Sequence, residues 1–138
     1  ESGLVHTVLG TAANVNDVTQ GHGLLHGAEA IVFADAGYQG ADKRTEATGV
    51  PWHVTLRPGK RRALDKNTPR GALRDKIEKL KASVRAKVEH PFRVIKRQFG
   101  HTKVRYRGLA KNTQQLITLF ALSNLWMVRH RLLKELAG

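Results

Sequence analysis

The first half of the chain carries short apolar runs that are separated by turn-forming residues. Runs at residues 4–13, 30–34 and 52–56 are rich in β-branched or aromatic side chains, so each run predicts a β-strand. The middle run, AIVFA, is apolar throughout, and such runs are typical of strands covered on both faces of a parallel or mixed sheet. These segments therefore predict a small sheet with a buried middle strand.

Two short helices are predicted between those strands. Residues 17–25 form the first helix, with Asp17 as its candidate N-cap, and three glycines within the segment weaken it. Residues 41–48 form the second helix, which Gly49 and Pro51 close. Both helices are short connections in this interpretation.

Helical periodicity dominates the second half of the chain. Residues 72–88 predict a long amphipathic helix, because their apolar side chains recur at helical spacing along one stripe. The stripe consists of Leu73, Ile77, Leu80, Val84 and Val88. Pro91 lacks a backbone donor and is expected to kink or end this helix, which then resumes until Gly100. Residues 112–136 predict a last helix, which is apolar on most sides and is therefore expected to be buried against a sheet.

The order of these elements indicates the fold class. Strand, helix, strand, helix, strand, long helix and buried helix follow one another, which is an α/β layout. The 138 residues are enough for one domain with one hydrophobic core, so residues 1–138 are predicted to form a single domain. The N-terminal strands that would complete the sheet are expected to precede residue 1.

Positive charge is concentrated in one part of the chain. There are 24 Lys and Arg residues against 11 Asp and Glu residues, which gives a net charge of +13. Residues 57–107 hold 18 basic residues against four acidic ones, whereas residues 1–56 have a net charge of −4. Such a concentration attracts polyphosphate through counterion release, which favours a nucleic-acid partner. A generally basic surface is the alternative. Within this region, residues 60–70 predict an exposed basic loop.

Composition argues against several other classes of protein. Without cysteine, the chain has neither a disulfide framework nor a cysteine-ligated metal. The longest apolar stretch, residues 116–128, includes polar side chains and is too short to span a membrane. The sequence shows no basic segment followed by an apolar core, which is the pattern of a secretion signal. We therefore expect a cytoplasmic protein with no membrane partner.

Asp35 is the first candidate for chemistry. It directly follows the apolar run at residues 30–34, and open α/β sheets place ligands at the carboxyl ends of their strands. A carboxylate at that position is a natural ligand for Mg²⁺, which takes one or two carboxylates together with water and phosphate oxygens. The structural alternative is a turn in which Asp35 bonds its own backbone.

Glu89 is the second candidate, on the long basic helix. Arg85 and Arg93 lie four residues before and after it, and Lys96 lies seven residues after it, so all four share one helical face. The functional interpretation is a metal-binding carboxylate among phosphate-binding cations. The alternative is an ordinary salt bridge between residues four apart, which contributes only a few tenths of a kcal/mol.

Three segments together resemble one protein family. The string ADAGYQG at residues 34–40 resembles the second-aspartate motif of DDE-type insertion-sequence transposases. Residues 85–100, RAKVEHPFRVIKRQFG, resemble their glutamate motif, in which three residues separate Arg from Glu and six separate Glu from Lys. Arg85, Glu89 and Lys96 match that spacing, whereas Ala82 stands where the signature has Tyr. Residues 10–20 resemble the turn that follows the early strands in this family.

The resemblance implies a bacterial ribonuclease-H-like catalytic domain that performs two-metal phosphoryl transfer on DNA. Three carboxylates would hold two Mg²⁺ or Mn²⁺ ions about 4 Å apart. Asp35 and Glu89 match the second and third of them. The first is expected on a strand before residue 1, so the chain alone is expected to cleave DNA poorly.

The resemblance also implies the partners of the chain. It implies double-stranded DNA, both transposon ends and target, a homo-oligomer in the synaptic complex, and a location in the bacterial cytoplasm at the nucleoid. It also implies phosphate contacts by Arg85 and Lys96, and Arg93 on the same helical face is expected to add one. Independently of the resemblance, the basic residues Lys60, Arg61 and Arg62 fit a patch that follows the DNA backbone, and a solvated basic loop is the alternative for these three.

Two other functions remain open at this point. A non-catalytic basic module that binds nucleic acid would keep every function after Asp35→Asn or Glu89→Gln. A ribonuclease-H-like nuclease without transposition would cleave DNA but would form no joined products. Each alternative therefore has an assay that separates it from a transposase.

Overall fold

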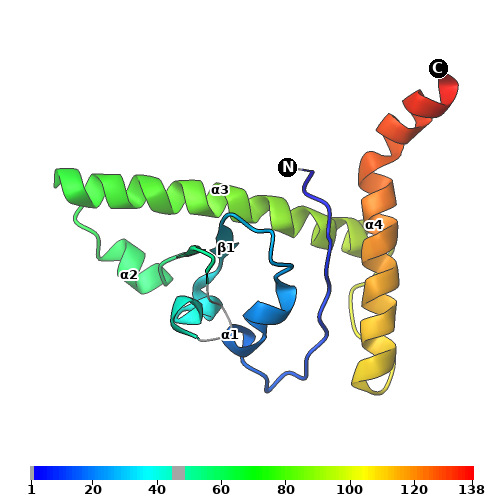
Figure 1. Cartoon of the computed structure of the whole chain (residues 1–138), viewed down its shortest axis with the longest axis horizontal. Coiled ribbons are helices and arrows are strands. Elements are labelled where there is room, and N and C mark those ends of the chain that lie inside the picture. The colour runs from blue at the N-terminus through cyan, green and yellow to red at the C-terminus, as the bar shows by residue number, and fades with distance from the viewer. Residues whose placement is uncertain (1, 45–48) are drawn as a thin grey trace. The chain divides into compact units, whose positions relative to one another are not determined.

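The computed structural model describes residues 2–44 and 49–138, which form two compact units (Figure 1). We call residues 14–86 the central unit, and residues 1–13 together with 87–138 the terminal unit. The long helix α3, Pro69–Arg97, passes from one unit into the other. Each unit is described by itself below.

The central unit is built on two parallel strands. Strand β1, Val32–Ala34, pairs with β2, Trp52–Val54, and Val32 stands opposite Trp52 in the register. The pairing extends beyond the strands, since Thr55 N–H donates to the Ala34 carbonyl at 3.0 Å. This sheet confirms the predicted strands at 30–34 and 52–56 and is compatible with the α/β class. The middle strand is less buried than its apolar run predicted, because Phe33 is 40% exposed.

A short helical segment precedes the sheet. Helix α1, Asp17–Gln20, continues into the 3₁₀ turn η1, Gly21–Leu24, which confirms a brief and irregular helix. Asp17 is not its cap as predicted. The preceding Asn16 has extended backbone, and its side chain accepts from the Val18 N–H at 3.3 Å. The Asp17 carboxylate is therefore left for other contacts.

Two further 3₁₀ turns lie between the strands. They are η2, Ala36–Tyr38, and η3, Ala41–Lys43. The helix predicted over residues 41–48 begins with η3, and its residues 45–48 lie outside the described residues. Gly40 joins the two turns with φ at 90°, a left-handed conformation that favours glycine.

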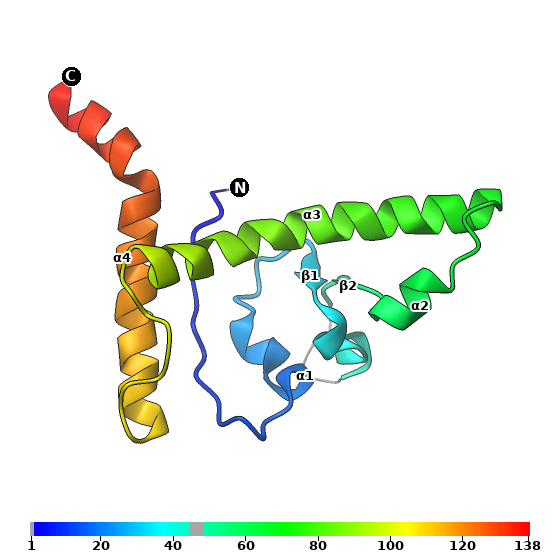
Figure 2. The same cartoon turned by 180° about the vertical axis from the view of Figure 1, so that it is seen from behind.

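The basic segment after β2 is only in part the loop that the sequence predicted, because residues 63–68 are non-helical and helices lie on either side of them. Helix α2, Pro58–Arg62, begins with proline, whose fixed φ suits the first position of a helix. Helix α3 begins soon afterwards, and the Thr68 hydroxyl accepts from the Gly71 N–H at 3.1 Å in its first turn. Only a short connection separates the two helices (Figure 2).

Helix α3 contacts the central unit through its polar side. The predicted apolar stripe is largely exposed, with Leu73 at 59% and Leu80 at 61%. Asp75 and Glu78, by contrast, are 5% and 4% exposed. Hydrophobic periodicity therefore located the helix, whereas ion pairs and backbone contacts determine which side the central unit covers.

Helix α3 continues through Pro91, where the sequence predicted a kink or an end. Pro91 and Ile95 are among the largest fully buried side chains, and Val94 is 5% exposed. Packing at these positions offsets the backbone hydrogen bond that proline cannot donate. The helix does stop near Gly100, as predicted, because Gly100 takes φ of 63° and His101 N–H donates to the Ile95 carbonyl.

Helix α4, Leu109–Ala137, forms the rest of the terminal unit. Phe120 is buried and meets the Phe92 ring edge-to-face, with 5.0 Å between centroids. The helix is apolar on most sides, as the sequence indicated, but the expected burial is wrong, because Leu125 is 57% exposed and Leu136 is 83% exposed. No helix in residues 2–44 and 49–138 is long and apolar enough to cross a membrane.

The N-terminal segment is extended but is not a strand. Residues 4–13, predicted as a strand, form no ladder in the described chain. Instead Val5 N–H donates to Asn124 Oδ1 at 2.9 Å, and Asn124 Nδ2 donates to the Val5 carbonyl at 2.6 Å. A helix side chain thus satisfies backbone groups that a neighbouring strand would otherwise satisfy.

Candidate active site

Asp35 stands at the carboxyl end of β1 and uses its two oxygens differently. Oδ1 accepts from the Gly37 N–H at 2.8 Å and caps η2, which confirms the structural alternative for this residue. Oδ2 lies 3.8 Å from Nη2 of Arg85 on α3. The side chain is 39% exposed, so the carboxylate remains open to solvent and to a ligand. The structural and functional interpretations of Asp35 are therefore compatible.

Asp17 lies beside Asp35, against Gly37. A Cβ atom added at Gly37 would stand 3.0 Å from Asp35 Oδ1 and 3.3 Å from Asp17 Oδ2. Glycine at this position lets both carboxylates approach the same stretch of backbone. The sequence suggested Asp17 as a helix cap and as a further carboxylate near the expected site, without a catalytic role.

The negative charge of these carboxylates affects the pKa of Tyr38. Burial raises the pKa of its hydroxyl, and the charges of Asp17 and Asp35 raise it further. The ring stacks on Trp52 with centroids 6.3 Å apart, and Gly21 leaves room for both rings. The hydroxyl therefore stays protonated at neutral pH, beside a pair of carboxylates that attracts cations.

The donors at this end of the sheet suit a hard divalent cation. Carboxylate oxygens are the ligands that Mg²⁺ and Mn²⁺ prefer, and Asp35 presents its oxygens at a partly exposed position. No group of three or more His, Asp or Glu side chains is close enough to hold a metal in the part of the chain that the structure describes. Beside Gly37, the carboxylates of Asp17 and Asp35 are the candidate ligands.

Glu89 lies on α3, one helical turn beyond Arg85. It is exposed and belongs to the terminal unit, as do Arg93 and Lys96. The structure therefore brings Asp35 together with Arg85 in the central unit, and it places the other three predicted residues further along the same helix.

The three predicted basic residues of α2 differ in their surroundings. Lys60 and Arg62 are exposed. Arg61 is only partly exposed, and its Nε donates to Oδ1 of the buried Asp75 at 3.2 Å. A role of Arg61 in organising its surroundings was not visible in the sequence, because Asp75 lies on another helix.

A second buried carboxylate joins α3 to the end of β2. Glu78 Oε2 accepts from the Leu56 N–H at 2.8 Å. Lys81 Nζ donates to Glu78 Oε1 at 2.9 Å and to the Val54 carbonyl at 3.0 Å. Arg85 follows Lys81 by about one turn, so these bonds hold α3 where Arg85 reaches Asp35. Sequence reasoning missed this pair as well.

Residues 1–125 match the model of a protein family described as the transposase DDE domain. The match includes Asp35, Arg85, Glu89 and Lys96. No solved structure matches the chain.

Proposed function

The chain belongs to the family of transposase DDE domains, and on that premise we propose that it serves DNA strand cleavage and strand transfer at the ends of an insertion sequence. We assign residues 1–138 to one catalytic domain of ribonuclease-H-like type. The parallel strands β1 and β2, with α3 bonded to the end of β2, are compatible with that fold.

The observation that carries this proposal is the ion pair of Arg85 with Asp35. It joins the second-aspartate motif to Arg85, the first residue of the glutamate motif, although the two residues are 50 positions apart in the sequence. Glu89 then follows Arg85 by one turn of α3. We propose that Asp35 and Glu89 are the second and third carboxylates of the family's active site.

These carboxylates would hold Mg²⁺ or Mn²⁺, two ions in a complete site. Bound cations of this kind activate the attacking hydroxyl and stabilise the leaving oxygen in phosphoryl transfer. The chain's own residues orient the reactants. Arg85 holds Asp35 at the strand end and adds positive charge beside it, and Gly37 keeps the approach free of side chains.

The same proposal assigns double-stranded DNA as the partner, in a homo-oligomeric synaptic complex. Residues 57–107 carry a net charge of +14, which suits sequence-independent contacts with phosphates. Lys60 and Arg62 on α2, and Arg93 and Lys96 on α3, are exposed and available for such contacts. Arg85 would contact DNA from beside the carboxylates.

Metal-directed cleavage of the polypeptide tests the shared carboxylate site. Fe²⁺ replaces Mg²⁺ in oxygen-donor sites, and with ascorbate and peroxide it cuts the backbone near the bound ion. We expect cuts near both Asp35 and Glu89, and we expect Asp35→Asn or Glu89→Gln to abolish the cuts at both positions. Asp42→Asn is the matched control, because Asp42 is an exposed carboxylate on η3 of the central unit.

The outcome separates the proposal from a non-catalytic binding module. Loss of both cuts in either variant, with no change in Asp42→Asn, supports one shared site. Cuts near Glu89 that persist in Asp35→Asn would show that the two carboxylates hold no common ion. DNA binding without any metal-dependent cut at residues 35 and 89 would favour the non-catalytic module.

A further inference from the structure

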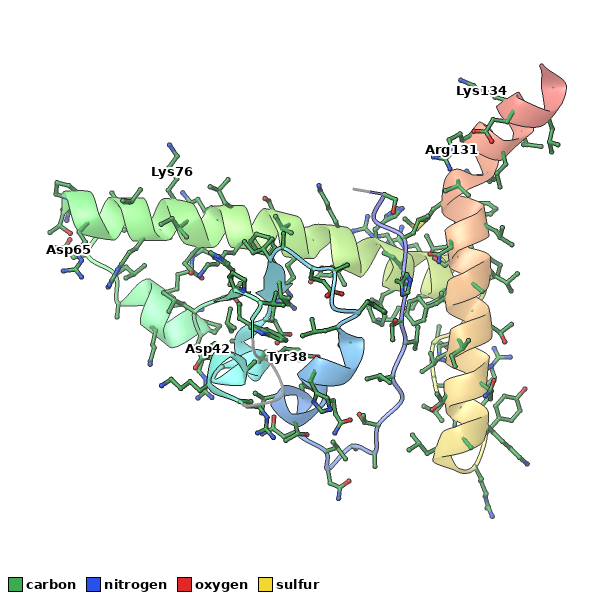
Figure 3. All side chains as sticks on the ribbon, in the orientation of Figure 1. Tyr38, Asp42, Asp65, Lys76, Arg131 and Lys134 are labelled. Carbon is green, nitrogen blue, oxygen red and sulfur yellow. The ribbon has the colours of Figure 1, made fainter. Side chains whose placement is uncertain are left out.

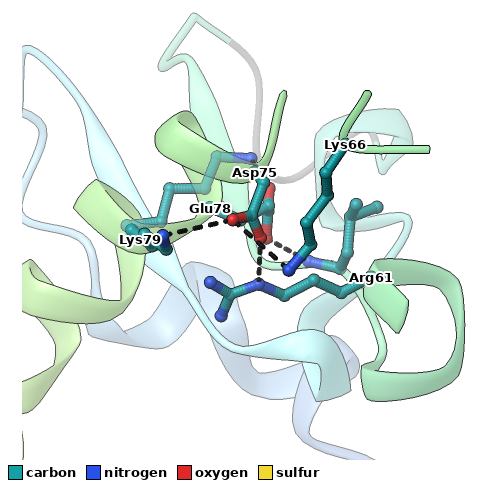
Figure 4. Close-up of polar contacts among 7 residues, drawn as sticks. Arg61, Lys66, Asp75, Glu78 and Lys79 are labelled. Carbon is teal, nitrogen blue, oxygen red and sulfur yellow. Dashed lines mark hydrogen bonds and ion pairs between the residues drawn. The ribbon is translucent and has the colours of Figure 1, made fainter. Parts of the chain in front are cut away.

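Three cations converge on one buried carboxylate at the start of α3 (Figure 4). Arg61 Nε lies 3.2 Å from Asp75 Oδ1, whereas Lys66 Nζ and Lys79 Nζ lie 3.6 and 3.4 Å from Oδ2. The Asp75 side chain is 7% exposed. We call these four residues the Asp75 cluster. They come from α2, from the α2–α3 connection and from α3.

The cluster has more positive charge than the carboxylate can neutralise. Burial raises the pKa of Asp75, but hydrogen bonds from Arg61 and Lys79 and the nearby charge of Lys66 outweigh burial and hold the pKa below its usual value. Asp75 therefore stays ionised at neutral pH. One negative charge faces three positive charges, so the cluster keeps a surplus of two. The neighbouring Glu78 does not reduce that surplus, because Lys81 pairs with it.

The cations also retain donors and access to solvent. The bond of Arg61 to Asp75 uses one of the five N–H donors of a guanidinium group. The side chains of Lys66 and Lys79 are 59% and 69% exposed. Donors for a second anion therefore remain on the exposed Lys66 and Lys79 side chains and on Arg61, whose side chain is 34% exposed.

The connection that carries Lys66 is held against α3. Thr68 Oγ1 donates to the Asp65 carbonyl at 2.9 Å and accepts from the Gly71 N–H at 3.1 Å. The Asp65 side chain accepts from the Asn67 N–H at 3.0 Å. Gly71 is buried, and a Cβ atom there would overlap the Asp65 carbonyl, so the connection lies directly on the helix. The backbone position of Lys66 beside α3 is therefore set before any ligand arrives.

The geometry points to a phosphate-binding site at the Asp75 cluster, with a backbone phosphate of duplex DNA as its ligand. Buried Asp75 orients Arg61, Lys66 and Lys79, and their surplus charge binds the phosphodiester. Guanidinium and ammonium groups are the side chains that recognise phosphate oxygens. The inference rests on the proposed function only for the choice of DNA as the polyanion. It assigns to Lys66, Lys79 and Asp75 a role outside the carboxylate site.

Equilibrium binding to a short duplex, measured by fluorescence anisotropy at NaCl concentrations between about 50 and 200 mM, tests the site. Each lost phosphate contact should reduce the slope of log K against log salt by about 0.9. We therefore expect this reduction for Lys66→Gln and for Lys79→Gln, and about twice that for the double variant. Lys76→Gln is the matched control, because Figure 3 shows Lys76 pointing from α3 away from α2. Its slope should equal that of the unaltered chain.

Asp75→Asn separates an organised site from a general effect of charge. This change raises the net charge from +13 to +14, so attraction by overall charge alone predicts tighter binding. The proposed site predicts weaker binding, because the three cations lose the carboxylate that holds them together. Thermal unfolding of each variant, followed by circular dichroism, verifies that the compared proteins are folded.

The results decide the inference independently of the carboxylate site. Slopes of Lys66→Gln and Lys79→Gln that equal the Lys76→Gln slope would overturn it, as would tighter binding by folded Asp75→Asn. So would an unaltered chain that does not bind duplex DNA. The Fe²⁺ cleavage pattern at residues 35 and 89 is measured without DNA, so failure of the proposed function would appear there and not in the salt slopes.

Discussion

Gly71→Ala is the substitution whose effect can be worked out most directly from the structure. Gly71 lies in the first turns of α3 and is buried. An alanine Cβ would overlap the Asp65 carbonyl oxygen and would stand 2.7 Å from its carbon and 2.9 Å from Thr68 Oγ1. Two of these three contacts are backbone atoms, so the α2–α3 connection must move as a whole.

Three terms determine the size of the effect. Forcing an extra carbon into a packed site costs about 1–3 kcal/mol. Loss of the Thr68 bond to the Gly71 N–H, which caps the helix, costs about 1 kcal/mol. Alanine in place of glycine stabilises a helix by about 1 kcal/mol, which offsets part of this cost. The expected result is therefore a decrease of about 1–3 kcal/mol in the free energy of unfolding.

Urea denaturation followed by tryptophan fluorescence measures this change. A Trp126→Phe background leaves Trp52 as the only tryptophan, so the signal reports the central unit. Gly59→Ala is the matched control. Gly59 lies in helix α2 and has no atom within 4 Å of an added Cβ, so its replacement should stabilise by up to about 1 kcal/mol. Equal or greater stability of Gly71→Ala would refute the close contact with Asp65.

Two titrations provide the remaining predictions. In a Tyr106→Phe chain, absorbance near the phenolate band should show Tyr38 ionising above its usual pKa of 10.0, and Asp17→Asn should lower that midpoint. If the Tyr38 midpoint is the same with and without Asp17→Asn, the charge of Asp17 does not act on Tyr38. Backbone donation from His26 lowers the pKa of Glu29 from 4.5 to about 2. The folded state thus binds fewer protons there, and this stabilisation is complete above pH 4.5 and is lost as the pH falls toward 2. Glu29→Gln should flatten the pH dependence of unfolding in that window, and an unchanged profile would contradict the assignment.

Local patterns in the sequence were enough to place several elements. The strands at 30–34 and 52–56, the end of α3 near Gly100 and the position of Asp35 at a strand end all depend on neighbouring residues. Such signals are short-range, since strand propensity, glycine conformation and turn chemistry act within a few residues. Asp35 and Glu89 could be named as candidates for the same reason, since each was recognised from the residues next to it in the sequence.

Long-range contacts account for the elements that the sequence missed. The strand predicted at 4–13 requires a neighbouring strand, and the bonds of Val5 go to Asn124 instead, which is 119 residues away. The continuation of α3 through Pro91 depends on burial of that ring in the terminal unit. Neither fact can be read from the residues around Val5 or Pro91.

Apolar periodicity correctly located α3 but did not identify the side of the helix that bonds to α2, β1 and β2. The polar residues Asp75, Glu78, Lys81 and Arg85 also recur every three or four positions, so they too share one side of the helix. Along that side, Asp75 meets the cations near α2, Glu78 and Lys81 meet the end of β2, and Arg85 meets the carboxylate at the end of β1. A charged residue at helical spacing usually indicates a solvated face. Here Asp75 and Glu78 are buried, and these two residues contact different segments. The polar side of α3 therefore sets the relative positions of the phosphate-binding residues and the Asp35 carboxylate, because a rigid helix fixes the rise and rotation between successive contacts.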